Sequence, residues 1–145
     1  MIRPFHTLPD IMELGLLVAK IQNGTGADRA VDEEVMALFF TRGTVCMGDR
    51  ENGVPVQRTA WVYPDSDKWT GLAPRFFTNS LDDILRTMRE FLPETTWMID
   101  AHAEHPARAI VRHGVELKAR TAPTPERALL TALLVVCDQV QRAQA

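Results

Sequence analysis

The sequence has few cysteines, no excess of basic residues and no long unbroken apolar run, and each absence excludes a class of protein. Its two cysteines, Cys46 and Cys137, lie far apart and form no CxxC pair. The net charge of −3 shows no excess of the basic residues that a nucleic-acid-binding protein uses to contact phosphates. Residues 1–6 lack the apolar core of a signal peptide. The C-terminal apolar run is broken by Thr131 and ends at Asp138, so it is too short to cross a membrane. We therefore expect a cytoplasmic protein with neither a nucleic-acid nor a membrane partner.

Motifs that carry chemistry are also missing. Gly24-Thr25-Gly26 lacks the third glycine and the preceding strand of a dinucleotide site, and the sequence has no Gly-Lys-Ser/Thr loop. Ser80 lies outside any G-x-S-x-G elbow. Asp65 and Asp67 lack the further acids and the closing glutamate of a calcium loop. The sequence therefore predicts no cofactor and favours a non-enzymatic protein.

The composition and the C-terminal region indicate one globular domain over residues 1–145, with residues 1–9 as a leader arm. Hydrophobic residues make up 46% of the chain and charged residues 24%, which is typical of a folded protein. Thr124 is suited to cap a helix, and Pro125 fits its first position because a missing N–H has no consequence there. Residues 128–140 are then apolar on a broad arc, so we expect this helix to form the core.

Three further helices are expected upstream. Asp10 caps the first, and Asn23-Gly24 stops it because both residues tolerate the left-handed conformation. The second helix spans residues 28–40, and the third begins after Ser80 and ends before Pro93. The solvent-facing acids of the second helix are expected to be Asp32, Glu33 and Glu34.

Strands are expected at residues 44–47 and 54–63, joined by a polar turn at 48–53 and followed by a loop at 64–74. Residues 95–103 and 107–118 alternate and should form a hairpin around a turn at 104–106. The residues of its second strand that face inward are expected to be Ala109, Val111, His113, Val115 and Leu117. The fold class is therefore α+β, with helices packed on a small, mainly antiparallel sheet or in a three-layer α/β/α sandwich.

Three segments stand out together, with Trp97 between the last two: Gly24-Thr25-Gly26-Ala27-Asp28-Arg29, Phe77-Thr78-Asn79-Ser80-Leu81-Asp82-Asp83-Ile84 and Pro123-Thr124-Pro125-Glu126-Arg127-Ala128-Leu129-Leu130-Thr131-Ala132-Leu133. As a set they resemble small phage and prophage proteins that carry a phage ABA sandwich domain. The resemblance covers roughly residues 11–140, and its motifs are capping and core signals. It implies helices on both sides of a sheet and a phage or prophage origin, and it implies no activity. Residues 44–74 are bulkier than the family pattern.

One cluster has the residue types of a metal site. Asp100 and His102 share a strand face, a workable spacing for two ligands of zinc or a similar ion, and Glu104 or His105 could reach around from the turn. Hairpin pairing places His113 on the opposite face, where we expect a hydrogen-bonded core histidine. The alternative interpretation of the cluster is a polar strand face with a solvated turn.

A second cluster is basic. Arg108, Arg112 and Lys118 share the outward face of the last expected strand, with Arg120 just beyond, and such a strip could neutralise phosphates. The alternative is a mixed sheet face, solvated or covered by another layer or subunit.

A third candidate surface lies in the loop after the second strand. Aromatic residues with mixed polar neighbours suit a protein interface. The residues of this predicted partner-binding site are Tyr63, Asp65, Asp67, Lys68 and Trp69.

Three functions remain as hypotheses. The first is a phage or prophage accessory protein that binds a host or phage protein. The second is a metal-dependent hydrolase or nuclease that uses Asp100 and His102. The third is a structural subunit that forms a homo-oligomer through its sheet face.

Overall fold

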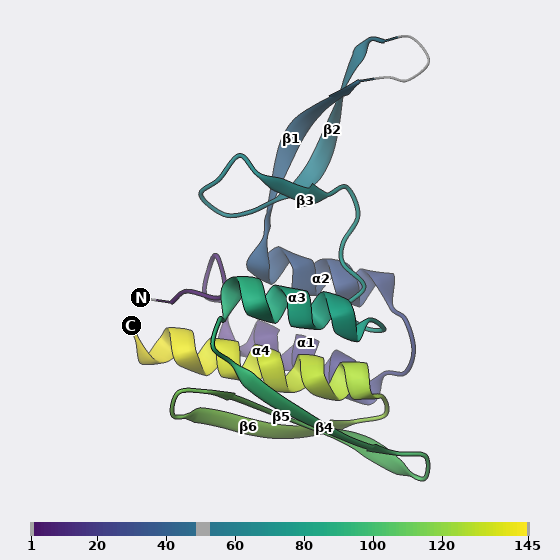
Figure 1. The fold of residues 1–145 in the computed structure, drawn as a ribbon, viewed down its shortest axis with the longest axis vertical. Coiled ribbons are helices and arrows are strands. Elements are labelled where there is room, and N and C mark those ends of the chain that lie inside the picture. The colour runs from purple at the N-terminus through teal and green to yellow at the C-terminus, as the bar shows by residue number, and fades with distance from the viewer. Residues whose placement is uncertain (1, 49–52, 145) are drawn as a thin grey trace.

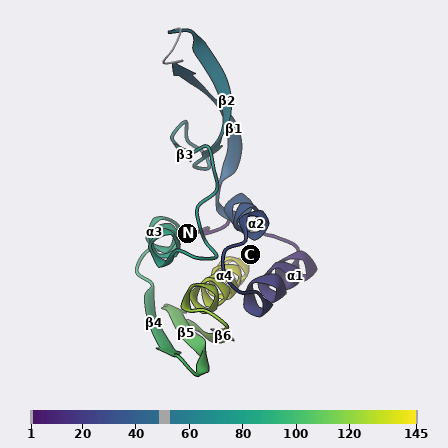
Figure 2. The ribbon, with the colours of Figure 1, turned by 90° about the vertical axis from the view of Figure 1, so that its right-hand side faces the viewer.

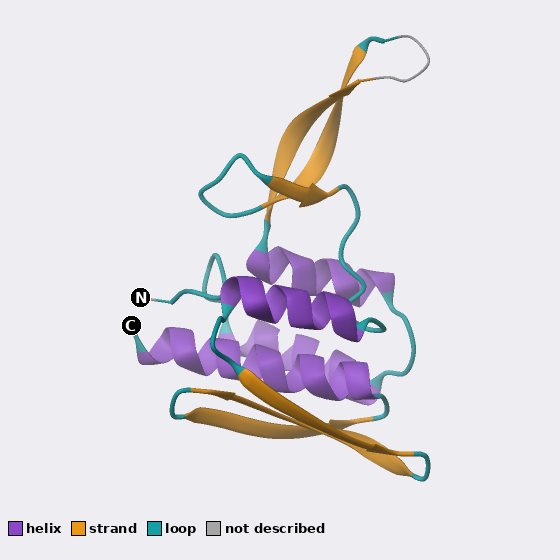
Figure 3. Cartoon of the chain, viewed as in Figure 1, coloured by secondary structure: helices purple, strands orange, loops and turns teal. Residues whose placement is uncertain are grey.

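The computed structural model describes residues 2–48 and 53–144, and these contain four helices and two three-stranded antiparallel sheets. The helices are α1 (Ile11–Asn23), α2 (Arg29–Phe39), α3 (Leu81–Phe91) and α4 (Pro125–Ala143). The first sheet has the order β1 (Thr41–Gly48), β2 (Pro55–Val62) and β3 (Trp69–Gly71). The second has the order β4 (Thr96–His102), β5 (His105–His113) and β6 (Glu116–Ala122). The α+β class is confirmed (Figure 3).

Helix α4 lies at the centre of the molecule, with the sheet β4-β5-β6 on one side and α2 and α3 on the other (Figures 1 and 2). Helix α1 runs alongside α4. The strands β1 and β2 form a hairpin, here called the arm, which projects away from the helices (Figure 2). The apolar arc expected for residues 128–140 is confirmed, because α4 is buried along most of its length. No helix within the described residues is long and apolar enough to span a bilayer.

The expected helix caps are confirmed at the three positions where the sequence marks them. The carboxylate of Asp10 accepts from the backbone N–H of Met12 at 2.9 Å. The hydroxyl of Ser80 accepts from the N–H of Asp83 at 3.2 Å, and that of Thr124 accepts from Arg127 at 3.3 Å. Each bond satisfies a backbone donor that the first turn leaves free. Local capping chemistry therefore sets where these helices begin.

Helix α1 ends at Asn23 with Gly24 as its C-cap, as expected, but the left-handed conformation expected at this stop is wrong. Gly24 has φ −90°, and the left-handed residue is Gly26, with φ +67°. A Cβ at Gly24 would collide with the guanidinium of Arg127. Arg127 is buried and donates to the carbonyl oxygens of Ile21 at 3.1 Å and of Gly26 at 2.8 Å. Glycine is therefore needed at this position so that Arg127 can reach the C-terminal end of α1.

The expectation that Asp32 faces solvent is also wrong. Its side chain is fully buried and accepts three hydrogen bonds. The N–H and hydroxyl of Thr78 donate to Oδ1 at 2.8 and 2.9 Å, and Arg29 donates to Oδ2 at 2.8 Å. A helical carboxylate can be buried because these donors replace water. Asp32 thus fixes the chain segment before α3 against α2.

Three strand assignments differ from expectation. The first strand begins at Thr41 rather than residue 44, and the expected loop at 64–74 contains β3. The expected strand at 107–118 is two strands, because the chain turns at Gly114, which has φ +60°. Val115 is consequently exposed at the tip of this turn, and Leu117 is also exposed. Part of the expected turn at 48–53, residues 49–52, lies outside the described residues.

Helix α4 covers only one face of the sheet β4-β5-β6. Ala107, Ala109 and Val111 are buried on that face, while Met98 and Leu117 lie exposed on the other. Among the described residues no helix covers the outer face, so the three-layer arrangement is not observed (Figure 2). Because β6 runs back along β5, the expected basic strip is also split between the two faces: Arg108 and Arg112 lie on the outer face, whereas Lys118 and Arg120 lie on the face toward α4.

Candidate functional site

The predicted metal ligands lie at the exposed end of the sheet β4-β5-β6. Asp100 Oδ1 and His102 Nε2 are 2.9 Å apart, and both side chains are 66% exposed. The His102 and His105 rings are 6.4 Å apart between centroids, and Glu104 lies in the turn between them. Within residues 2–48 and 53–144, no three His, Cys, Asp or Glu side chains come close enough to hold a metal ion together. The structure therefore brings two of the four predicted ligands, Asp100 and His102, together in a solvent-exposed contact.

His113 lies on the face toward α4, away from Asp100, as expected from the hairpin pairing. It is half-buried, and its Nδ1 atom lies 3.1 Å from the hydroxyl of Thr95. Since Thr95 Oγ1 also lies 2.6 Å from the carbonyl oxygen of Leu92, the hydroxyl links the end of α3 to the sheet. This arrangement gives His113 a structural hydrogen bond.

The predicted partner-binding residues divide into one anchor and four surface residues. The Tyr63 ring packs between Phe40 at 5.0 Å and Phe91 at 6.2 Å, and its hydroxyl accepts from Arg75 at 3.2 Å. Lys68 lies over the outer side of the Tyr63 ring, with its Nζ atom 5.2 Å from the centroid. The surface residues are Asp65, Asp67, Lys68 and Trp69. Tyr63 therefore positions the loop, and Trp69, at 41% exposure, is the aromatic residue that the loop offers to solvent.

Arg75 joins the sheet β1-β2-β3 to α3. It is buried and donates to the hydroxyls of Thr87 at 2.7 Å and Thr70 at 3.1 Å. It also makes a forked contact with the Glu90 carboxylate, at 3.0 and 3.2 Å. Arginine suits this position because its planar fork can serve several acceptors at once. The root of the arm is thus held rigidly against the helices.

Beyond this root, the arm has two chemically different faces. Met47 pairs with Val56, and these side chains share one face with Val45, because side chains alternate along a strand. All three are half-buried, yet none belongs to the hydrophobic core or packs against it. On the opposite face, Cys46 pairs with Gln57, and both are exposed. The arm therefore presents a face, here called the apolar face, on which the half-buried side chains of Val45, Met47 and Val56 lie outside the core. Arg58, which pairs with Val45, is exposed on the same face.

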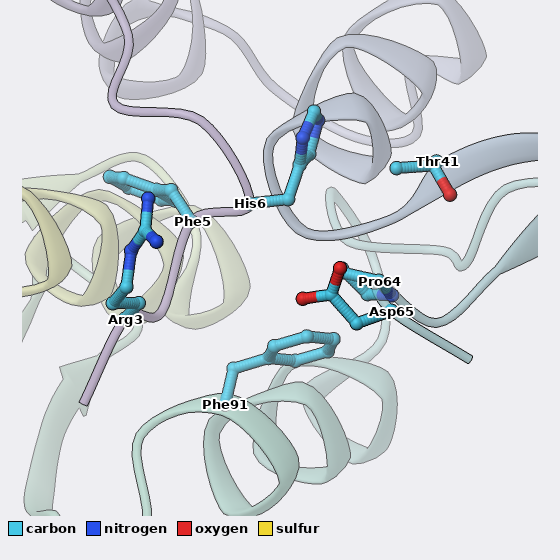
Figure 4. Close-up of a pocket in the computed structure, with 7 residues that line it drawn as sticks. All are labelled: Arg3, Phe5, His6, Thr41, Pro64, Asp65 and Phe91. Atoms are coloured by element: carbon cyan, nitrogen blue, oxygen red, sulfur yellow. The ribbon is translucent and has the colours of Figure 1, made fainter. Parts of the chain in front are cut away.

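A pocket of about 350 Å³ lies at the root of the arm (Figure 4). Arg3 and Asp65 bring opposite charges to its rim, and the rings of Phe5 and Phe91 form apolar wall. Asp65 has φ +58°, a left-handed conformation that aspartate tolerates better than most residues. The remaining lining residues are His6, Thr41 and Pro64. The volume is at the small end of ligand pockets.

The polar groups of this pocket do not form a nucleophile and base. His6 uses Nε2 toward the carbonyl oxygen of Ala37 at 2.8 Å and Nδ1 toward the Thr7 hydroxyl at 3.0 Å. The hydroxyl of Thr41 donates to the carbonyl oxygen of Val62 at 3.4 Å. With these groups engaged by the backbone and by Thr7, the pocket can accommodate a small polar group but offers no activated nucleophile.

Sequence reasoning missed the apolar face of the arm. The alternation of Thr44, Val45, Cys46 and Met47 indicates a strand with one polar and one apolar face. Such alternation normally indicates that the apolar face packs against the core. No layer formed by residues 2–48 and 53–144 packs against this face, and this depends on the direction in which the hairpin leaves the helices. No family model, no curated protein and no solved structure matches the chain.

Proposed function

We propose that this chain is a non-enzymatic binding protein that holds another protein with its arm and with Trp69. The observation that supports this proposal is the apolar face of Val45, Met47 and Val56, which lies outside the core. Apolar surface of this kind gains about 25 cal/mol per Å² when it leaves water. A partner protein with a matching apolar surface would supply that cover.

The form of the arm supports the same proposal. An isolated two-stranded hairpin is only marginally stable in water, so an uncovered arm gains stability from a partner. Its strands have eight residues each, which gives a reach of about 26 Å at 3.3 Å per residue. The anchored root holds the arm in a defined direction, which lowers the entropy lost on binding.

The setting of this binding activity is part of the proposal. The resemblance to phage ABA sandwich proteins suggests an accessory protein that acts in the cytoplasm of a bacterial host. The partner is then a host protein or a second phage protein. The proposal assigns the chain no cofactor and no reaction.

The test uses two neighbouring residues on opposite faces of β2. Val56→Lys places a charge on the apolar face, whereas Gln57→Lys places the same charge on the polar face one residue away. A photo-crosslinker attached to Cys46, the exposed cysteine, captures proteins that contact the arm in host lysate. Each captured protein is then purified, and its affinity for the two variants and for Trp69→Ala is measured by calorimetry.

We expect Val56→Lys to weaken the purified partner's binding at least tenfold and Gln57→Lys to change it less than threefold, since a buried charge must shed its water. Trp69→Ala should also weaken binding, while circular dichroism of all three variants stays unchanged. Equal affinities for the two lysine variants would show that the apolar face is not the contact surface.

A further inference from the structure

Helix α1 is apolar on nearly all sides although it lies at the edge of the molecule (Figure 2). Its polar residues are Glu13, Lys20, Gln22 and Asn23. A helix that is apolar all round is normally covered all round. Residues 2–48 and 53–144 cover only one side of α1, where Leu14, Leu17 and Ile21 are buried. The opposite side of α1 has the apolar composition of a buried surface, but no described element packs against it.

The uncovered side is a continuous face. Residues spaced three and four apart along a helix lie on the same face, so Ile11, Met12, Gly15, Leu16 and Ala19 form one surface, here called the outer face of α1. Ile11 and Leu16 are each 67% exposed and Met12 is 78% exposed. Exposed apolar groups that adjoin in this way mark an interaction site, whereas single ones do not.

Gly15 is unexplained within the monomer. A glycine inside a helix costs about 1 kcal/mol relative to alanine. A Cβ at Gly15 would meet no atom within 4 Å, so nothing in the described chain requires its absence. With Ala19 one turn later, Gly15 leaves a shallow trough between the larger side chains. A trough of small residues allows a second helix to approach closely.

A hollow adjoins this face. It has a volume of about 380 Å³, lies between α1 and α2, and is walled by Leu14, Leu16 and Leu17 of α1 and by Ala37 and Leu38 of α2. Its lining is largely apolar, with Glu13, Lys20 and Glu34 around it. An apolar side chain from a partner helix can enter there beside Leu16.

We propose that the outer face of α1 is the contact surface for a second copy of this chain, packed α1 against α1 in an antiparallel, two-fold arrangement. The face is self-complementary, because the ridge of Met12 and Leu16 on one copy can fill the trough of Gly15 and Ala19 on the other. Two-fold dimers are the commonest closed assemblies, and each copy then uses the same surface. The proposal is independent of the proposed function of the arm.

Charge favours the antiparallel orientation. Glu13 lies in the first turn of α1 and Lys20 in the last. Antiparallel packing brings Glu13 of one copy beside Lys20 of the other, and it opposes the two helix dipoles. In parallel packing Glu13 and Lys20 of one copy would lie across the contact from those of the other, so the opposite charges would not meet. Within the described residues, Lys20 also contacts Glu34 at 3.1 Å, whereas Glu13 makes no ion pair.

The first test measures self-association of the full chain by sedimentation velocity over a hundredfold range of protein concentration. The wild type should form a dimer, and Leu16→Glu should raise the dimer Kd at least tenfold. Met98→Glu, which places the same charge on the exposed outer face of the sheet, should leave the Kd within threefold. A wild type that stays monomeric throughout, or a dimer that only Met98→Glu disrupts, overturns the proposal.

A second variant guards against simple misfolding. Gly15→Ala should make the monomer more resistant to urea, because alanine favours the helix and meets no atom of the fold. The same methyl group fills the trough and should weaken the dimer at least tenfold. A Gly15→Ala variant that is more stable as a monomer but dimerises more weakly would indicate that the two helices approach closely at Gly15. A Gly15→Ala protein that dimerises as tightly as the wild type contradicts it.

Charge reversal tests the orientation. Glu13→Lys alone should weaken the dimer, because it meets Lys20 of the other copy, and Glu13→Lys with Lys20→Glu should restore it. If the double variant associates no better than the single one, the antiparallel pairing is wrong.

Discussion

At the scale of single residues, the buried carboxylate of Asp32 is the strongest stability determinant that sequence reasoning misjudged. Asp32→Ala leaves the N–H and hydroxyl of Thr78 and the Arg29 guanidinium without their shared acceptor. We expect a loss of about 3 kcal/mol in the free energy of unfolding, measured by urea denaturation. The neighbouring Glu33→Ala is the control, because Glu33 is exposed and pairs with exposed Arg42, a contact that contributes less than about 1 kcal/mol. Similar losses in both variants would show that the Asp32 bonds contribute little.

The two cysteines differ in burial and should differ in reactivity. Burial raises the pKa of the Cys137 thiol, whereas Cys46 is exposed on the arm. A thiol reagent should therefore modify Cys46 in the native protein and reach Cys137 only when the chain unfolds. Rapid modification of both thiols in the native state would show that the elements packed against α4 do not shield Cys137 from solvent.

The raised pKa of Cys137 also gives a pH dependence with a defined sign. The unfolded thiol loses its proton near pH 8.5, while the folded thiol keeps it to higher pH. The contribution of Cys137 to stability is thus fully present below about pH 8.5 and declines as the pH rises above that value. Unfolding measured in urea from pH 7 to 10 should show the stability advantage of the wild type over Cys137→Ala shrinking.

At the scale of secondary structure, Arg75 links the arm to the helices. Arg75→Met removes its bonds to Tyr63, Thr70, Thr87 and Glu90, and we expect unfolding to become easier by about 3 kcal/mol. Arg86→Met is the matched control, because Arg86 contacts the same carboxylate at 3.0 Å from an exposed position. That variant should lose less than about 1 kcal/mol. Urea denaturation, followed by tryptophan fluorescence, compares the two, and an equal loss would argue against the Arg75 network as the anchor.

The helices could be predicted from the sequence because each one carries its own start signal. Asp10, Ser80 and Thr124 cap where expected, since a cap depends on residues within one turn. The strands were less predictable. The turn at Gly114 interrupts an alternating run, yet it contains no proline and no two-residue motif typical of a tight turn. Strand β3 forms because three residues of the expected loop pair with β2. Pairing between distant residues is not encoded locally.

At the scale of the whole molecule, the three segments on which the sequence-based family hypothesis rests, residues 24–29, 77–84 and 123–133, lie next to one another. Asp28 donates its N–H to the Thr78 hydroxyl at 2.8 Å, and Arg127 donates to the carbonyl oxygen of Gly26. Their capping and core residues thus meet across long stretches of chain.

The candidate site was only partly predictable. Trp69 was identified from the sequence as an aromatic residue in a polar loop. The apolar face of the arm and the outer face of α1 could not be identified in this way, because they depend on which described elements pack against them in the fold.

The attachment of α1 to α4 has a consequence for how the sequence can change over generations. Arg127 holds α1 through backbone carbonyl oxygens of Lys20, Ile21 and Gly26, and none of these bonds involves a side chain of the helix it secures. Substitutions on the exterior of that helix therefore leave this attachment unchanged. The proposed contact surface on that helix can therefore diverge while the same arginine keeps the helix in place.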